Sequence, residues 1–237
     1  MSGFDIRAMA QAARAASQVL ARATGETKNA ALRAMAAGLL DSRERILAAN
    51  AEDVAVARAE AHPSAFVDRL TLTAPRLDAM ARGLRQIADL PDPVGEITGM
   101  WRRPNDLQVG RMRVPLGVIG IIYESRPNVT PDAAGLCLNS SNAVILRGGR
   151  EALRTNAAIG GILAAAVGSV GLPETSLAVV PTPDRAVVKE MLLLSGLIEL
   201  DSIITHEMSL EDFDRAFQLI QSGEAIKVVM TVPHQER

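Results

Sequence analysis

The sequence predicts an α/β fold: a doubly wound, Rossmann-like parallel sheet preceded by an N-terminal helical region and a β-hairpin. Short apolar runs rich in valine and isoleucine have the composition of buried parallel strands, at residues 117–123, 142–147 and 176–180. Helical stretches alternate with them, at residues 130–140, 151–168 and 184–195. Alternation of this kind indicates right-handed βαβ units in one sheet.

The N-terminal region, residues 5–90, has the pattern of successive helices. Leu32, Met35, Ala36 and Leu39 recur at i, i+3, i+4 and i+7, which places an apolar stripe on one helix face.

Three local signals divide this region. Asp41 and Glu44 have the spacing of a capping box, which predicts a helix start that leads toward Ala59. Pro63 should break that helix, and Thr73 followed by Pro75 should open another.

A hairpin and a fourth strand complete the expected organisation. After a proline-punctuated linker, 90–96, two β-like runs flank the turn sequence Arg103-Pro104-Asn105-Asp106. A further apolar run at 196–200 predicts a fourth strand. We therefore expect a helical part over 1–95, a hairpin and nucleotide-binding core over 96–200, and a helix–strand tail over 201–237.

The composition excludes several functional classes. The 237 residues are 48% hydrophobic and 22% charged with a formal net charge of −2, so no global basic field attracts nucleic acid. Aromatic residues make up only 3%, too few for a platform that stacks bases. No apolar stretch reaches the roughly 18 residues of a membrane span. A single cysteine suits a reducing compartment, and we expect a cytoplasmic protein.

Ligands of doubly wound sheets bind at the carboxyl ends of the strands. This rule brings residues 123–128, 147–151 and 181–184 to one edge of the sheet. Gly148 and Gly149 follow a strand and precede a helix, so they either admit a phosphate or ribose at a helix N-terminus or form a plain βα turn. Arg147 either pairs with a phosphate or is a solvated strand-end cation.

Two further residues have competing interpretations. The side-chain amide of Asn128 could donate to a developing oxyanion, or it could form an Asx turn before the next helix. Cys137, the only cysteine, lies in a predicted apolar helix, where burial makes a thiol inert, so we interpret it as a core residue. The three histidines, His62, His206 and His234, lack the spacing of metal ligands.

Residues 6–200 resemble the γ-glutamyl phosphate reductase (glutamate-5-semialdehyde dehydrogenase) family of the aldehyde dehydrogenase superfamily. The resemblance rests on "VPLGVIGIIYESRPNVTPDAAGLCLNSSNAVILRGGREALRTN" (114–156) and "GLPETSLAVVPTPDRAVVKEMLLLSGLIEL" (171–200). It implies an aldehyde-dehydrogenase-like cofactor domain. It also implies NADPH-dependent reduction of L-glutamate 5-phosphate to L-glutamate 5-semialdehyde, a step of proline biosynthesis.

The resemblance also assigns roles. It implies that Arg147, Gly148, Gly149 and Glu151 hold the adenosine ribose of NADP(H), and that the arginine suits a 2′-phosphate. It implies that Asn128 stabilises the oxyanion and that Ser125 and Arg126 lie beside the substrate. Cys137 matches a cysteine of the cofactor domain, whereas the family's nucleophile lies downstream.

The sequence departs from this family near 198–202. Residues 201–232 instead resemble the C-terminus of zinc-dependent alcohol dehydrogenases of the glutathione-dependent formaldehyde dehydrogenase type, without their zinc ligands. We expect a hybrid chain, truncated before the catalytic cysteine and with impaired reductase activity. The alternatives are a non-catalytic NADP(H)-binding or homo-oligomerising module and a degenerate fragment.

Overall fold

A three-stranded parallel sheet in the order β3-β4-β5 organises residues 4–194 in the computed structural model. Its strands are β3 (Val118–Ile122), β4 (Ala143–Arg147) and β5 (Leu177–Val179). Val118 pairs with Ala143 and Val144 pairs with Leu177. The first four residues of the central strand are buried, as the continuous apolar runs predicted. The prediction of a doubly wound parallel sheet is confirmed.

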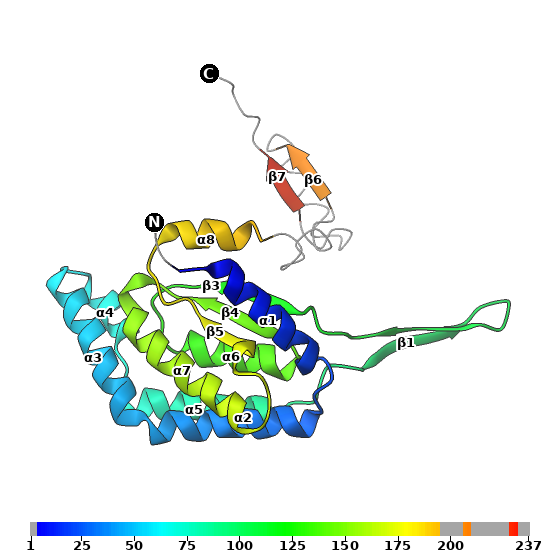
Figure 1. Ribbon diagram of the computed structural model, residues 1–237, viewed down its shortest axis with the longest axis horizontal. Coiled ribbons are helices and arrows are strands. Elements are labelled where there is room, and N and C mark those ends of the chain that lie inside the picture. The colour runs from blue at the N-terminus through cyan, green and yellow to red at the C-terminus, as the bar shows by residue number, and fades with distance from the viewer. Residues whose placement is uncertain (1–3, 195–205, 210–227, 232–237) are drawn as a thin grey trace. The chain divides into compact units, whose positions relative to one another are not determined.

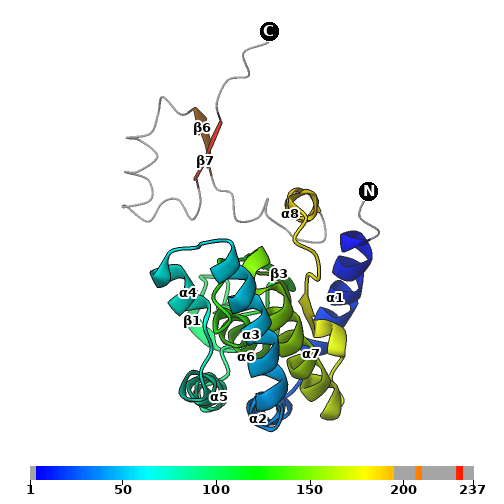
Figure 2. The ribbon, with the colours of Figure 1, turned by 90° about the vertical axis from the view of Figure 1, so that its left-hand side faces the viewer.

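Helices cover both faces of this sheet (Figures 1 and 2). On one face lie α6 (Val129–Asn139) and α7 (Leu153–Ser169), and on the other lies α1 (Ile6–Leu20), which contacts all three strands. Short 3-10 turns, η1 (Arg150–Ala152) and η2 (Glu174–Ser176), precede α7 and β5. The last helix described, α8 (Arg185–Leu192), packs beside α1.

The remaining helices form an outer layer against α6 and α7. They are α2 (Gly25–Asp41), α3 (Arg43–Ala59), α4 (Ser64–Leu70) and α5 (Ala74–Ala88). Thr73 caps α5 by accepting a hydrogen bond from Arg76 N, as the Thr-x-Pro signal predicted. The predicted stripe Leu32, Met35, Ala36 and Leu39 is fully buried.

The predicted capping box at Asp41 and Glu44 is wrong. Asp41 is the last residue of α2, and Ser42 is the N-cap residue of α3, with no capping hydrogen bond from its side chain. The chain turns from α2 into α3 through Ser42 alone. Asp41, the expected N-cap residue, is therefore still part of α2. Helix α4, which follows Pro63, had no sequence signal of its own.

A buried lysine joins the outer layer to the sheet. Lys28 of α2 is fully buried, and its ammonium donates to Asp92 Oδ1 at 2.8 Å, Asn139 O at 2.9 Å and Ser141 Oγ at 2.9 Å. These acceptors use all three of its donors. The contact fixes the segment before the hairpin and the turn that leads into β4.

The hairpin projects away from the rest of this unit as an extended arm (Figure 1). Strands β1 (Ile97–Arg102) and β2 (Gln108–Met112) pair antiparallel, with Trp101 opposite Val109. The predicted turn is confirmed, and Asp106 adopts the left-handed conformation there with φ 64°.

The structure describes residues 4–194, 206–209 and 228–231. A second compact unit spans Ser195–Arg237, in which β6 (His206–Ser209) and β7 (Val228–Thr231) pair in parallel. Strand β7 lies in the helix–strand tail expected over 201–237. The predicted strand at 196–200, the junction at 198–202 and the tail helix after Ser209 lie outside the described residues. Among the described helices, none is long and apolar enough to cross a membrane.

Candidate functional site

The loops that follow the three parallel strands meet at the carboxyl edge of the sheet. Ser125 Oγ, after β3, donates to Glu151 Oε2, after β4, at 2.5 Å. Arg147 Nη2, at the end of β4, donates to Pro183 O, after β5, at 2.9 Å. The predicted juxtaposition of residues 123–128, 147–151 and 181–184 is therefore confirmed.

Gly148 and Gly149 allow close approach of these loops. A Cβ at position 148 would lie 2.2 Å from Asn156 Nδ2, and one at position 149 would lie 2.0 Å from Ser125 Oγ. Neither separation is compatible with a side chain unless its neighbour moves. The glycines are thus required by packing within the protein itself, a reason that neither sequence interpretation included.

The Arg147 guanidinium binds the protein's own backbone. Its Nη1 donates to Gly148 O at 3.0 Å, in addition to the Nη2 bond to Pro183 O. Its Nε is buried and has no hydrogen-bond partner within the described part of the chain. A buried donor without a partner costs free energy. Arg147 is not a freely solvated strand-end cation.

Two charged residues, Arg150 and Glu151, lie directly after the glycines. Burial alone would raise the pKa of Glu151, but hydrogen bonds from Ser125 and Arg150 outweigh it and lower that pKa. Arg150 Nε lies 3.0 Å from Glu151 Oε1 and its Nη2 lies 3.1 Å from Glu60 Oε2. With 61% of its side chain exposed, Arg150 is the more accessible of the two arginines at this loop.

The N-terminus of α7 already holds a carboxylate. Asp53 of α3 is 2% exposed and accepts from Thr155 N at 2.8 Å and from Thr155 Oγ1 at 2.7 Å. Residue Ala152, the N-cap of α7, provides no side-chain cap, so Asp53 supplies it from another helix. Asp53 thus occupies one of the backbone donors at this helix end.

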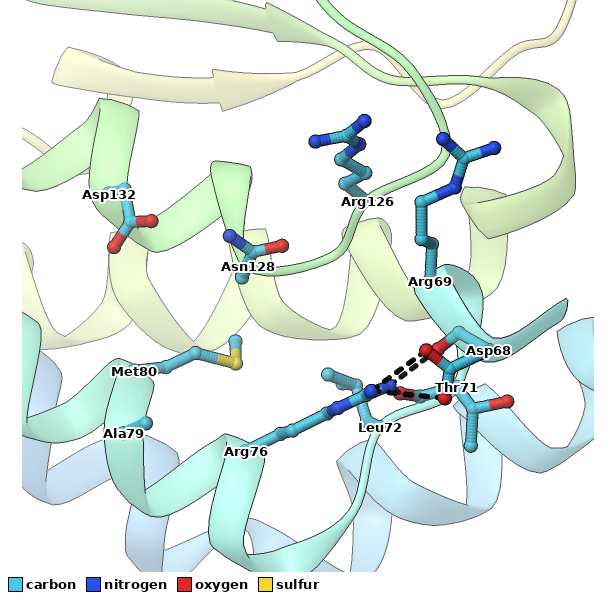
Figure 3. Close-up of a pocket in the computed structure, with 10 residues that line it drawn as sticks. All are labelled: Asp68, Arg69, Thr71, Leu72, Arg76, Ala79, Met80, Arg126, Asn128 and Asp132. Carbon is cyan, nitrogen blue, oxygen red and sulfur yellow. Dashed lines mark hydrogen bonds and ion pairs between the residues drawn. The ribbon is translucent and has the colours of Figure 1, made fainter. Parts of the chain in front are cut away.

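A cavity of about 380 Å³ opens beside the loop that follows β3 (Figure 3). Residues of α4, α5 and the start of α6 line it: Asp68, Arg69, Thr71, Leu72, Arg76, Ala79, Met80, Arg126, Asn128 and Asp132. It contains two of the residues that the sequence singled out, Arg126 and Asn128. Ser125, the third residue predicted in the loop after β3, does not line the cavity. Its side chain is 6% exposed and donates a hydrogen bond to Glu151.

Asn128 is the N-cap residue of α6, and Asp132 lies in the first turn of that helix. The side chain of Asn128 makes no capping hydrogen bond, so the Asx-turn alternative is not what the structure shows. Burial raises the pKa of Asp132, and a hydrogen bond with the Asn128 side chain partly offsets that rise. The amide of Asn128 is exposed and lines the cavity, where it can donate to a ligand oxygen.

Cys137 is buried in α6, as predicted. It is 5% exposed, and burial raises the pKa of its thiol to about 11. A thiol that stays protonated near neutral pH is a poor nucleophile. The interpretation of Cys137 as a core residue is confirmed.

Histidine and acidic residues form no metal site in the described ranges. Within residues 4–194, no group of three or more His, Cys, Asp or Glu side chains could hold a metal ion. His62 stacks on Phe66, with ring centroids 4.5 Å apart, and lies 3.2 Å from Glu60 Oε2. His234 lies outside these ranges.

Several contacts of the site gave no sequence signal, although Tyr123 lies in the segment 123–128 that the sequence placed at this edge. Tyr123 Oη lies 2.7 Å from Thr130 Oγ1, which donates to Asn156 Oδ1 at 3.0 Å. Burial raises the pKa of Tyr123, although its hydrogen bond to Thr130 acts in the opposite direction. Asp53 and Arg69 were also missed, because both belong to the N-terminal helices and reach this edge only through tertiary packing.

Comparisons with known proteins support the resemblance over most of the chain. The chain is 52% identical over 197 residues to γ-glutamyl phosphate reductase of Thermoanaerobacter sp. (strain X514), an alignment that covers 83% of this chain and 48% of that protein. Identity to the γ-glutamyl phosphate reductase of Geotalea daltonii is 51% over 195 residues, which covers 82% and 47% of the two chains. The chain spans about half the length of the curated relatives it matches. No family model matches it.

Solved structures give the same result. The crystal structure of γ-glutamyl phosphate reductase from Thermotoga maritima matches with a TM-score of 0.79 and 35% identity, covering 96% of this chain and 53% of that one. A probable aldehyde dehydrogenase from Listeria monocytogenes matches with a TM-score of 0.62 at 15% identity, covering 86% and 41%. The fold is therefore aldehyde-dehydrogenase-like, as the resemblance implied.

Proposed function

We propose that this chain is the cofactor-binding portion of a γ-glutamyl phosphate reductase, the enzyme that reduces L-glutamate 5-phosphate to L-glutamate 5-semialdehyde with NADPH in proline biosynthesis. The observation that carries the proposal is the 52% identity over 197 residues, which include both strand-end loops of the site. The geometry of these loops supports nucleotide and substrate binding on neighbouring parts of one sheet edge.

The residues after β4 fit a nicotinamide cofactor. The unpartnered Nε of Arg147 offers a buried donor directly before Gly148 and Gly149. Arg147, Gly148, Gly149 and Glu151 would hold the adenosine ribose. Because both Nη atoms of Arg147 bind backbone carbonyls, we assign contact with the 2′-phosphate of NADP(H) to the exposed Arg150.

The loop after β3 would serve the substrate. When bound, the cofactor supplies a hydride, and the protein's task is to orient the acyl group and stabilise charge on its oxygen. The exposed amide of Asn128 can donate to that oxygen. Arg126, which also lines the cavity, can bind the phosphate. Ser125 holds this loop against Glu151 and so positions both residues.

Turnover by this chain alone should be low. Acyl-phosphate reduction through a covalent thioester needs an accessible thiolate. The sequence contains one cysteine, and it is the buried Cys137 with its raised pKa. We propose that the chain binds both ligands and has little or no reductase activity by itself.

Calorimetric titration of the purified chain with NADPH, with NADH as the comparison, tests this function. We expect saturable binding that prefers NADPH, weakened by Arg150→Ala. The matched control is Arg22→Ala, an exposed arginine after α1 that is absent from the site. Failure to bind either nucleotide would contradict the proposal.

Self-association is a second candidate function, which the hairpin arm favours. Its apolar side chains are exposed, with Ile97 at 56%, Met100 at 59% and Met112 at 60%. Exposed apolar side chains along free strand edges are typical of surfaces that pair with another chain. We propose a homo-oligomer, and sedimentation velocity over a range of concentrations tests it. Met100→Lys should shift the population toward monomer, whereas a wild-type chain that stays monomeric throughout would refute it.

The tail remains a separate proposal. We infer from its sequence that residues 201–232 are of alcohol-dehydrogenase type, joined to the reductase portion near 198–202 in a hybrid chain. The parallel pair β6–β7 is compatible with that origin. A chain ended after Leu194 that binds NADPH as the full chain does would show that the tail is dispensable for the cofactor.

A further inference from the structure

The cavity beside α6 brings together two arginines from distant parts of the sequence. Arg126 lies in the loop after β3, and Arg69 lies on α4, yet both line the same cavity (Figure 3). Both residues are exposed, so their guanidinium groups are accessible to a ligand. Like charges that converge on one cavity repel each other until an anion lies between them.

The acidic groups nearby leave these two cations largely uncompensated. Asp68 is engaged by Arg76, whose Nη2 lies 3.1 Å from both of its carboxylate oxygens. Arg126 has only a surface ion pair, with Glu124 Oε2 at 3.4 Å, which a ligand can replace at small cost. Within the described residues, Arg69 has no acidic partner at ion-pair distance.

Hydrogen bonds from Arg76 hold the turn between α4 and α5, next to Arg69. Arg76 Nη1 donates to Thr71 O at 2.7 Å while its Nη2 binds Asp68. Thr71 Oγ1 in turn donates to Val67 O at 2.7 Å. Arg69 lies between the two residues that Arg76 holds, Asp68 and Thr71, so its backbone is fixed on both sides.

The charges also follow an order along the cavity. Figure 3 shows the guanidinium groups of Arg69 and Arg126 toward one side, Asp132 toward the other, and Asn128 between Arg126 and Asp132. L-Glutamate 5-phosphate has the same sequence of groups: a phosphoryl dianion, an acyl carbonyl and, at the far end, an ammonium beside the α-carboxylate. Two arginines suit the dianion, an amide suits the carbonyl oxygen and a carboxylate suits the ammonium.

We propose that Arg69 is a second substrate-binding arginine that holds the phosphoryl group together with Arg126, and that Asp132 receives the α-ammonium at the opposite end. This inference rests on the proposed function and extends it, because it assigns the helical N-terminal region a direct part in substrate recognition. Specificity for a phosphorylated amino acid over a simple acyl phosphate then comes from Asp132.

Ligand binding tests the assignment without requiring turnover. The probe is a phosphonate analogue of L-glutamate 5-phosphate in which methylene groups replace the acyl carbon and the bridging oxygen, titrated calorimetrically into the full chain. Arg69→Ala should weaken its binding at least about 10-fold, and Arg69→Lys should weaken it less, because lysine keeps the charge and loses the planar fork. Arg82→Ala, an exposed arginine of α5 outside the cavity, is the matched control and should bind as the wild type does.

A second probe separates the two ends of the cavity. Asp132→Asn should weaken binding of the amino phosphonate and leave unchanged the binding of the same compound without its amino group. Equal effects on both compounds would overturn the assignment of Asp132. Thermal unfolding of each variant confirms that it is folded.

The outcomes distinguish this inference from the proposed function. If Arg126→Ala weakens binding and Arg69→Ala does not, the inference about Arg69 is wrong and the proposed function stands. If the chain binds NADPH but not the phosphonate, the substrate assignment of the cavity falls while the cofactor assignment stands. If neither NADPH nor the phosphonate binds, the substrate assignment and the cofactor assignment are both wrong.

Discussion

Ser125 Oγ donates to Glu151 Oε2 at 2.5 Å, and this bond ties the loop after β3 to the loop after β4. It explains why the serine is buried beside an exposed arginine and asparagine. It also couples the two halves of the site, because residues 126–128 serve the proposed substrate and residues 147–151 the proposed cofactor.

Removal of this bond should destabilise the fold in a pH-dependent way. The folded-state pKa of Glu151 lies below its usual value of 4.5, so its ionised form contributes stability above that pH, which is lost as the pH falls through the folded pKa. Ser125→Ala should cost about 1–3 kcal/mol near neutral pH, since it removes a hydrogen bond to a charged group. Urea denaturation from pH 7 down to about 3 should show the two proteins converging in the acid. A constant difference across that range would contradict the role of Glu151.

A methyl group at position 149 should disrupt the same contact. Gly149→Ala would place its Cβ 2.0 Å from Ser125 Oγ, so we expect a loss of about 1–3 kcal/mol from overpacking. Gly161→Ala in α7 is the matched control, because a Cβ there meets nothing within 4 Å. That variant should gain about 0.5–1 kcal/mol from reduced backbone entropy. Equal midpoints in urea for both variants would refute the packing argument.

Asp53 should behave as a helix cap supplied from a distance. Asp53→Ala removes the acceptor for Thr155 N and Thr155 Oγ1 and should cost about 2 kcal/mol of unfolding free energy. The exposed neighbour Glu52, which pairs with Arg154 at 3.1 Å, provides the control, and Glu52→Ala should change stability by less than about 1 kcal/mol. Equal losses of unfolding free energy in guanidinium for Asp53→Ala and Glu52→Ala would contradict the capping role of Asp53.

The hydrogen bonds of the buried Lys28 ammonium should be costly to remove. Lys28→Met takes away the donor to Ser141 Oγ and to the carbonyl of Asn139, and one of the two donors to the exposed Asp92, which should destabilise the protein by about 1–3 kcal/mol. Arg33→Ala in the same helix loses only an exposed pair with Asp89 at 3.6 Å and should cost less than about 1 kcal/mol. Thermal unfolding followed by circular dichroism measures both, and a mild Lys28→Met phenotype would show that the contact is dispensable.

The thiol of Cys137 should react only when the protein opens. Its burial and a pKa of about 11 predict slow modification by an aromatic disulfide reagent at pH 7 and rapid modification in denaturant. Raising the pH toward 10 should accelerate the reaction of the native protein. Rapid labelling at neutral pH, before unfolding, would contradict the assignment of Cys137 to the core.

The sheet was predictable from sequence because its strands are continuous apolar runs and the first four residues of the central strand β4 are buried. Continuous apolar runs such as 142–147 have few alternatives to a central parallel strand, and the strand ends then locate the loops. Asn128 and Arg126 could therefore be placed at a common edge before their contacts were known. The capping error at Asp41 arose because a one-residue junction leaves no room for the motif that the spacing suggested.

The rest of the site depends on contacts that no local pattern encodes. Asp53 reaches Thr155 across 102 positions of sequence, and Arg69 shares a cavity with Arg126 only because α4 and α5 pack near the start of α6. Similarly, Gly148 and Gly149 look alike in sequence whether they admit a ligand or a neighbouring loop. Only the positions of Asn156 and Ser125 show that the neighbours already fill that space.

The three bonds of Lys28 have a consequence for how the chain folds. Its ammonium joins residues that are 64, 111 and 113 positions away, so it can form only after loops of that length have closed. Contacts of such high sequence separation slow folding and bind distant segments into one cooperative unit. We therefore expect amide hydrogens of α2 and β4 to exchange through the same global opening.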